Sequence, residues 1–182
     1  MNIIIKSKNS LRASCPICLS ILFSSMLFII SCNNPFAPGL AEDGSEHSIL
    51  GDQKTVEGVF QNFRYSYIFK DTVVYGNLLH NDFTFVYRDY DRGVDVSWGR
   101  DEDMLSTNGL FQGTQNLDLI WNDIVLEIGD STLKDISRSF NLTVMFSASD
   151  VIRVQGRASF RLKRNNTQEI WRIIQWRDES NY

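Results

Sequence analysis

The sequence feature that most constrains the fold is a strict alternation near the C-terminus. Between Ile152 and Lys163, apolar or small residues occupy the even positions and polar residues, four of them cationic, occupy the odd positions. A period of two residues predicts a long antiparallel strand that has one face on a core and the other in water. This region therefore belongs to a sheet with a one-sided core.

The rest of the chain after Gly113 repeats this period. A final strand, from about Glu169 to Arg177, is apolar on both faces, which predicts a central or covered position in the sheet. No proline follows Pro38, as suits long paired strands. The other alternating apolar residues are Leu117, Leu119, Trp121, Ile124, Leu126, Ile128, Phe140, Leu142, Val144 and Phe146.

Helical spacing dominates the region before Gly113. An apolar stripe at three- and four-residue intervals predicts an amphipathic helix from Lys54 to about Phe69. A second short helix begins at Asp71 or Thr72, has Val73, Val74, Leu78 and Leu79 on its apolar side, and ends at Asn81-Asp82.

Two short strands and a third helix follow. The strands are expected at about 83–87 and 94–98, with a turn between them. Asp101 is the expected cap of the third helix, whose apolar side is supplied by Met104, Leu105 and Leu110. Helices followed by long antiparallel strands define an α+β fold with the helices on one side of a curved sheet.

Three passages resemble the nuclear transport factor 2-like superfamily, which includes polyketide cyclase-like (SnoaL-like) domains and ketosteroid isomerases. They are Phe69-Lys70-Asp71, the passage from Leu78 to Phe83, and the passage from Trp171 to Trp176. The resemblance implies a cone-shaped domain with N-terminal helices packed on a strongly curved, mainly antiparallel sheet. It also implies a pocket and, often, a homodimer through the sheet. It implies no single reaction, because a fold does not define a function.

The N-terminus has the pattern of a secretory signal. Three cations within residues 1–12 precede an apolar run that extends to Ile30. The run from Ala13 to Ser31 could also span a bilayer as an uncleaved helix. The residues that follow decide which of these two alternatives we expect.

Ile29-Ile30-Ser31-Cys32 resembles the lipobox of bacterial lipoproteins. The resemblance implies cleavage after Ser31 and a thioether-linked diacylglycerol on Cys32. Several acyl chains on one residue give stable membrane attachment. Asn33 is not the Asp that marks inner-membrane retention in many Gram-negative bacteria, so the resemblance favours the outer membrane. Which face of that membrane carries the domain stays open.

We therefore expect three regions. Residues 1–31 form the signal peptide, residues 32–52 form the lipidated N-terminus and a flexible tether, and residues 53–179 form the folded domain. Cys15 and Cys18 would be removed with the signal, which leaves no intramolecular disulfide. Removing the three signal cations changes the net charge from −4 to −7.

An acidic domain is a poor partner for nucleic acid, because that binding depends on clustered Lys and Arg. No sequence motif predicts a cofactor. Two acidic runs, Asp89 to Asp95 and Asp101 to Asp103, depart from the spacing of an EF-hand, so we expect them in loops and at a helix start rather than at a metal.

The sequence identifies no catalytic residue. His80 lies two residues before Asp82 and could pair with it as a base and its orienting carboxylate. At the expected helix end, however, the two side chains would diverge, and Asp82 would accept backbone N–H bonds.

Two residue sets are candidates for binding. Aromatic residues with polar tips could line an apolar pocket, and they are Tyr67, Tyr87, Trp98 and Trp121. A cationic row could form a basic face or be an ordinary solvated strand face, and it consists of Arg153, Arg157, Arg161 and Lys163.

Two functions from different classes fit these observations. The favoured hypothesis is a membrane-anchored, noncatalytic module that binds a small apolar ligand or another envelope protein. The alternative is a small isomerase, cyclase or dehydratase whose base is a pocket carboxylate with a raised pKa. A buried acid next to a tyrosine in the pocket would favour the enzyme.

Overall fold

A computed structural model describes residues 49–179. The predicted signal peptide, Cys32 and residues 33–48 lie outside the described residues. The helices are α2 (Val56–Phe69), α3 (Thr72–Leu78) and α4 (Arg100–Gly113). The strands are β1 (Leu79–Asp89), β2 (Val94–Gly99), β3 (Asn116–Gly129), β4 (Leu133–Ser147), β5 (Asp150–Lys163) and β6 (Arg172–Asp178). Within this part of the chain, no helix is long and apolar enough to cross a membrane.

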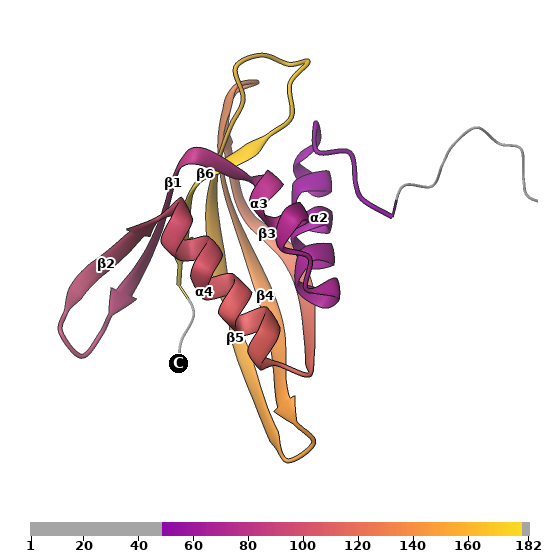
Figure 1. The fold of residues 1–182 in the computed structure, drawn as a ribbon. Helices are drawn as coiled ribbons and strands as arrows, with labels where there is room; N and C mark the ends of the chain where they lie inside the picture. The colour runs from indigo at the N-terminus through magenta and orange to yellow at the C-terminus, as the bar shows by residue number, and fades with distance from the viewer. Residues whose placement is uncertain (1–48, 180–182) are drawn as a thin grey trace, which may run out of the picture. The chain divides into compact units, whose positions relative to one another are not determined.

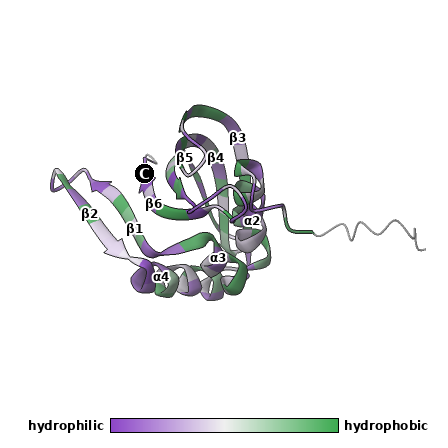
Figure 2. Ribbon diagram, turned by 90° about the horizontal axis from the view of Figure 1, so that it is seen from above, coloured by the Kyte–Doolittle hydropathy of each residue, from purple (hydrophilic) through white to green (hydrophobic). Residues whose placement is uncertain are grey.

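All six strands form one sheet in the order β2-β1-β6-β5-β4-β3. The β1–β6 pair is parallel and the other pairs are antiparallel. The last strand, β6, lies between β1 and β5, which confirms the central position predicted from its two apolar faces. The sheet curves, and the helices cover its inner side (Figures 1 and 2).

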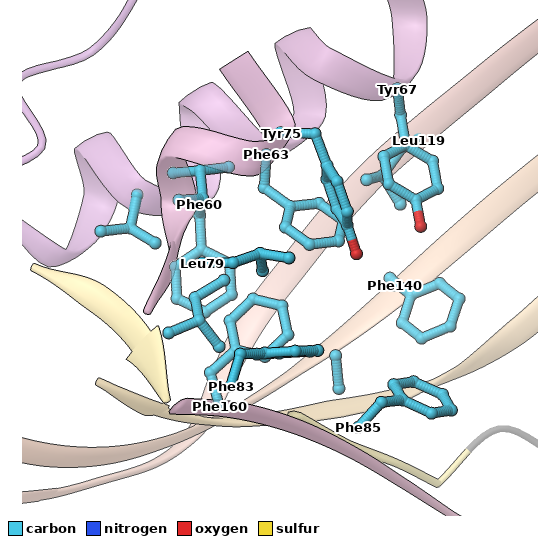
Figure 3. Packing of buried hydrophobic residues seen from close by; sticks show 14 of the residues in the cluster. Phe60, Phe63, Tyr67, Tyr75, Leu79, Phe83, Phe85, Leu119, Phe140 and Phe160 are labelled. Atoms are coloured by element: carbon cyan, nitrogen blue, oxygen red, sulfur yellow. The ribbon is translucent and has the colours of Figure 1, made fainter. Parts of the chain in front are cut away.

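Helix α2 packs on the sheet through the predicted stripe. The Thr55 hydroxyl caps it by accepting a bond from Gly58 N at 3.0 Å, and Lys70 ends it in a left-handed conformation with φ of 56°. The aromatic stripe residues point from α2 toward the sheet (Figure 3). The buried apolar members are Val59, Phe60, Phe63 and Tyr67.

Part of the predicted tether contacts α2. The backbone N–H of Gly51 donates to Asn62 Oδ1 at 2.6 Å, and Asn62 Nδ2 donates to Gly51 O at 3.0 Å. A Cβ on Gly58 would lie 1.9 Å from Asp52 O, so only glycine allows this close approach. Residues 51 and 52 are thus held against the folded domain.

Helix α3 is shorter than predicted. Asp71 caps it, accepting bonds from Val73 N and Val74 N at 2.9 Å each. The expected end at Asn81-Asp82 is wrong, because Leu79 already pairs with Ile173 as the first residue of β1. Backbone pairing with a strand almost a hundred residues away overrides the local pattern.

The predicted N-cap and apolar side of α4 are also wrong in part. The helix begins at Arg100, one residue before the predicted cap Asp101, and Gly99 precedes it without a side-chain cap. Leu105 is 73% exposed. The buried positions of α4 are instead Asp103, Thr107 and Phe111, which follow one another at intervals of four residues.

The alternation of β5 is confirmed over its second half, where Ala158, Phe160 and Leu162 are buried. Ile152 is 49% exposed because the β4–β5 turn extends beyond the helices (Figure 1). At the sheet edge, the second half of β3 exposes Ile124, Val125, Leu126 and Ile128. The homodimer through the sheet stays a prediction.

Candidate active site

A cavity of about 220 Å³ lies among the helices and the sheet, with walls contributed by α2, α4 and all six strands. An apolar cavity of about 150 Å³ is enough to hold benzene, so this one has room for a ring-sized molecule. Most of the wall is apolar or aromatic. The lining residues are Phe63, Tyr67, Phe85, Trp98, Asp103, Ser106, Thr107, Leu110, Leu119, Trp121, Phe140, Leu142, Val154, Trp176 and Asp178.

Asp103 is the buried carboxylate of this cavity, with 3% of its surface exposed. Its Oδ2 accepts a hydrogen bond from the Tyr75 hydroxyl at 2.6 Å, and its Oδ1 accepts one from Trp98 Nε1 at 3.1 Å. Tyr75 comes from α3 and Trp98 from β2, so three elements fix the carboxylate. Each oxygen keeps a second lone pair, which a ligand proton could reach.

Burial raises the pKa of Asp103 above its ordinary value, because a charged carboxylate loses its hydration there. The bonds from Tyr75 and Trp98 oppose this shift, because they stabilise the ionised form. Burial also raises the pKa of Tyr75 well above its ordinary value, so this phenol stays protonated and continues to donate. The pair thus combines a carboxylate that accepts protons readily with a donor that orients it.

Three of the four predicted lining residues belong to this cavity, namely Tyr67, Trp98 and Trp121. Trp121 donates its Nε1 hydrogen to Phe60 O at 2.9 Å. Tyr87 is not among the lining residues and packs on Trp98, with ring centroids 5.5 Å apart. Hydrogen bonds therefore fix the orientations of Trp98 and Trp121 in the wall.

Sequence reasoning missed both Asp103 and Tyr75. Asp103 closes an acidic triplet that reads as charge at a helix start, and Tyr75 lies in a short helix whose sequence pattern places Val73 and Val74 on the apolar side. The spacing of Asp103, Thr107 and Phe111 could have identified the buried face of α4. The acidic triplet by itself does not distinguish the buried acid from its exposed neighbours.

His80 and Asp82 are not part of this cavity. The expectation that they diverge is wrong, because both lie on β1 and their side chains approach each other. His80 Nδ1 lies 3.6 Å from Asp82 Oδ2 and accepts the Asp82 backbone N–H at 3.1 Å. We expected the Asp82 carboxylate to accept backbone N–H bonds. Instead, the His80 imidazole accepts one.

The cationic row of β5 is divided. Arg161 forms a two-bond ion pair with Asp135 at 2.7 and 3.1 Å, and Arg157 lies 3.6 Å from Glu179. Within residues 49–179, Arg153 and Lys163 have no ion pair. Half of the row thus behaves as the solvated, cross-paired strand face that the sequence left open as an alternative.

The acidic side chains of the two runs form ion pairs with cations or lie apart from one another. Asp95 accepts bonds from Arg88 and Arg177, each at 3.1 Å, which lower the pKa of this carboxyl. In the described part of the chain, no group of three His, Cys, Asp or Glu is arranged to hold a metal ion.

Comparison with solved structures identifies the fold. A conserved protein from Planctomyces limnophilus has a TM-score of 0.61 at 12% identity, with 69% of this chain and 93% of that chain covered. A candidate scytalone dehydratase from Novosphingobium aromaticivorans has a TM-score of 0.60 at 10% identity, with coverage of 70% and 82%. A nuclear transport factor 2-like superfamily protein from Salmonella enterica has a TM-score of 0.56 at 14% identity, with coverage of 71% and 91%.

No family model and no curated protein sequence matches the chain. The structural likenesses show that residues 49–179 have the nuclear transport factor 2-like fold, which confirms the predicted α+β class with a curved, mainly antiparallel sheet. On this fold the chain carries an apolar cavity with one buried carboxylate that accepts two hydrogen bonds. Such an arrangement can bind a small apolar molecule and exchange a proton with it.

Proposed function

We propose that this protein is a small acid–base enzyme in which Asp103 moves a proton to or from an apolar, ring-sized substrate. The observation that carries the proposal is the buried Asp103 carboxylate on the apolar cavity, bonded to Tyr75 at 2.6 Å and to Trp98 at 3.1 Å. The likeness to a candidate dehydratase adds support for the reaction type. In the sequence, the noncatalytic hypothesis is favoured by the absence of a His–carboxylate pair, whereas the enzyme alternative calls for a buried acid next to a tyrosine, which Asp103 and Tyr75 supply.

The chemistry follows from the environment of the carboxylate. A raised pKa makes Asp103 a stronger base than an exposed aspartate, which suits removal of a proton from a carbon next to a carbonyl group. Asp103 then returns the proton to another carbon, giving isomerisation, or passes it to a β-hydroxyl group, which leaves as water as the C–O bond breaks and a C=C bond forms, giving dehydration. The mainly apolar wall lowers the local dielectric constant, which strengthens these electrostatic interactions.

Deuterium exchange tests the proposal with model substrates in place of the natural one. The full chain is incubated in D₂O with a panel of one- and two-ring ketones and β-hydroxy ketones, and deuterium incorporation and water loss are measured by mass spectrometry. The Asp103→Asn variant keeps the shape and loses the base, so we expect the rate to fall by roughly a hundredfold to ten-thousandfold. Tyr75→Phe should keep part of the activity with an altered pH profile.

Asp101→Asn is the matched control, because Asp101 lies in the same helical turn but is exposed. It should exchange at the wild-type rate. Equal rates for wild type and Asp103→Asn would exclude Asp103 as the base. Binding of panel members without any exchange would support the noncatalytic ligand-binding module.

We also propose that the domain is held at the outer membrane through a lipidated Cys32. The support is the lipobox pattern Ile29-Ile30-Ser31-Cys32 and Asn33 after it. A Cys32→Ala variant should lose a metabolically incorporated acyl label and leave the membrane fraction, whereas Cys18→Ala should keep both. Membrane retention of Cys32→Ala would support an uncleaved helical anchor instead.

A further inference from the structure

A second cavity, of about 510 Å³, shares no lining residue with the first. It is formed by the end of α3, the start of β1, the start of α4 and the segment that joins β5 to β6. Its wall is mainly polar and includes four cations, Arg100, Lys163, Arg164 and Arg172. This concentration of positive charge is unusual for a chain with a net charge of −4.

Within the described residues, none of these four cations forms an ion pair. The carboxylate among the lining residues is Glu169, and its oxygens accept bonds from Asn165 Nδ2 at 2.8 Å and Asn166 Nδ2 at 2.9 Å. Elsewhere on the sheet, Arg161 and Arg177 each have a carboxylate partner. The cavity thus holds unneutralised charge.

Two of the cations directly face each other. Lys163 on β5 and Arg172 on β6 are cross-strand partners in the antiparallel pair. Like charges in this position destabilise a sheet. An anion bound between them would remove the repulsion.

The arginine side chains are held in place by neutral groups. Arg100 Nη2 donates to Gly76 O at 3.0 Å and Arg172 Nη1 donates to Asn77 O at 2.7 Å. The Arg164 guanidinium lies over the Trp171 ring, 4.1 Å from its centroid. These contacts orient the guanidinium groups without neutralising them, so their charge stays available to a ligand.

One of the cations of the polar cavity also carries a buried donor without a partner in the described part of the chain. Arg100 Nε is buried and forms no hydrogen bond within residues 49–179. A buried donor without an acceptor costs free energy, so the Arg100 guanidinium is held in this wall without a full set of partners.

We propose that this cavity binds a small molecule through a phosphate group. A phosphate monoester carries nearly two negative charges near neutral pH, which matches a cluster of four cations better than the single charge of a carboxylate does. The planar fork of arginine fits phosphate oxygens with two parallel bonds. The volume, several times that of a benzene-sized cavity, leaves room for an organic part beside the phosphate.

Thermal unfolding of the full chain tests this site with inorganic phosphate and phenyl phosphate as ligands, at an ionic strength held constant with KCl. A ligand that binds the native state raises Tm in a saturable way. We expect both ligands to do so, and Lys163→Gln to weaken their apparent affinity about tenfold, the equivalent of one charge-assisted bond.

Arg153→Gln is the matched control, because it removes an exposed cation from the same strand and should leave the affinity unchanged. Arg100→Lys is the second variant, because it keeps the charge and removes the Nε donor, and it should weaken binding by less than Lys163→Gln. Circular dichroism confirms that each variant is folded. An equal loss in Arg153→Gln and Lys163→Gln, or Tm shifts no larger than those with KCl, would overturn the site.

A parallel measurement distinguishes a soluble phosphate from a lipid headgroup. The Cys32→Ala chain is mixed with phosphatidylcholine vesicles with and without phosphatidic acid. If the acidic vesicles displace phenyl phosphate, and the Lys163→Gln variant loses this effect, the phosphate belongs to a lipid. If they do not displace it, the phosphate belongs to a soluble molecule. Because the site excludes Asp103, Asp103→Asn should bind phosphate as the wild type does, so the two proposals can fail separately.

Discussion

The two cavities of this domain differ in the partners of their charged side chains. The first turn of α4 supplies a residue to each, Asp103 to the apolar cavity and Arg100 to the polar one. Asp103 is buried with two donors bonded to its oxygens, whereas the cations of the polar cavity are held beside neutral carbonyl groups. A carboxylate enclosed by aromatic rings needs hydrogen-bond donors from the protein. Cations that border a polar cavity can stay without a carboxylate partner until a ligand binds.

The cavities also differ in their relation to the core. The wall of the apolar cavity includes core residues such as Phe63 and Leu119, so function and stability depend there on the same side chains. The cations of the polar cavity are not part of the core cluster, and two of them repel each other. Substitution of Phe63 and substitution of Lys163 should therefore have opposite effects on stability.

The largest effect is expected for Phe63→Ala. Phe63 is 1% exposed and packs against several aromatic rings, so the change should lower the free energy of unfolding by about 3–5 kcal/mol in urea denaturation. Phe69→Ala, on the same helix but 62% exposed, should cost less than about 0.5 kcal/mol. Similar losses for both would contradict the assignment of this wall to the core.

Tyr75→Phe should have the next largest effect. It removes the 2.6 Å bond to Asp103 and leaves the carboxylate with one donor, at a cost of about 1.5–3 kcal/mol near neutral pH. The loss should shrink in acid, where the carboxyl is neutral. Tyr90→Phe, at an exposed position, serves as the control and should be neutral.

The pH dependence of stability should reveal the buried acid. Because the pKa of Asp103 is raised in the folded state, the folded protein binds more protons than the unfolded chain between the ordinary and the raised pKa. Stability relative to Asp103→Asn should therefore fall as pH rises through this window, and be highest below the ordinary pKa. Urea denaturation from about pH 3.5 to about pH 8 measures this difference, and a difference that is constant with pH would contradict a raised pKa.

The smallest effect is expected for Lys163→Gln, with the opposite sign. Relief of the repulsion from Arg172 should raise the free energy of unfolding by up to about 0.5 kcal/mol in low salt without phosphate. The gain should fade with added KCl, since salt screens exposed charges. Arg153→Gln should show no comparable gain, and a loss of stability in Lys163→Gln would indicate an unrecognised partner for this lysine.

Much of the fold could be predicted because its signals are local and repeated. The apolar stripe of α2 and the alternation of β5 follow from the side-chain periods of helix and strand. The errors lie at element boundaries and in the buried face of α4. The helix predicted to continue to Asn81-Asp82 ends at Leu78 because Leu79 pairs with Ile173, and no local signal in either segment encodes that contact.

The candidate sites could be predicted only in part. Tyr67, Trp98 and Trp121 are identifiable as lining residues because aromatic rings with polar tips suit pockets. The acidic triplet alone does not distinguish Asp103 from Asp101, because both are acids in the first turn of one helix. The sequence groups Lys163 with three arginines of its strand, although its neighbour in space is Arg172.

The sequence by itself determined the α+β class, the long strands and the expectation of a lipid anchor, because these depend on periods and motifs that neighbouring residues carry. Only the tertiary structure decided which acid is buried and which cations meet. Burial and charge pairing depend on contacts between α3, α4 and strands far apart in the chain. Those contacts set the dielectric environment and the partners of each charged group, and with them its chemistry.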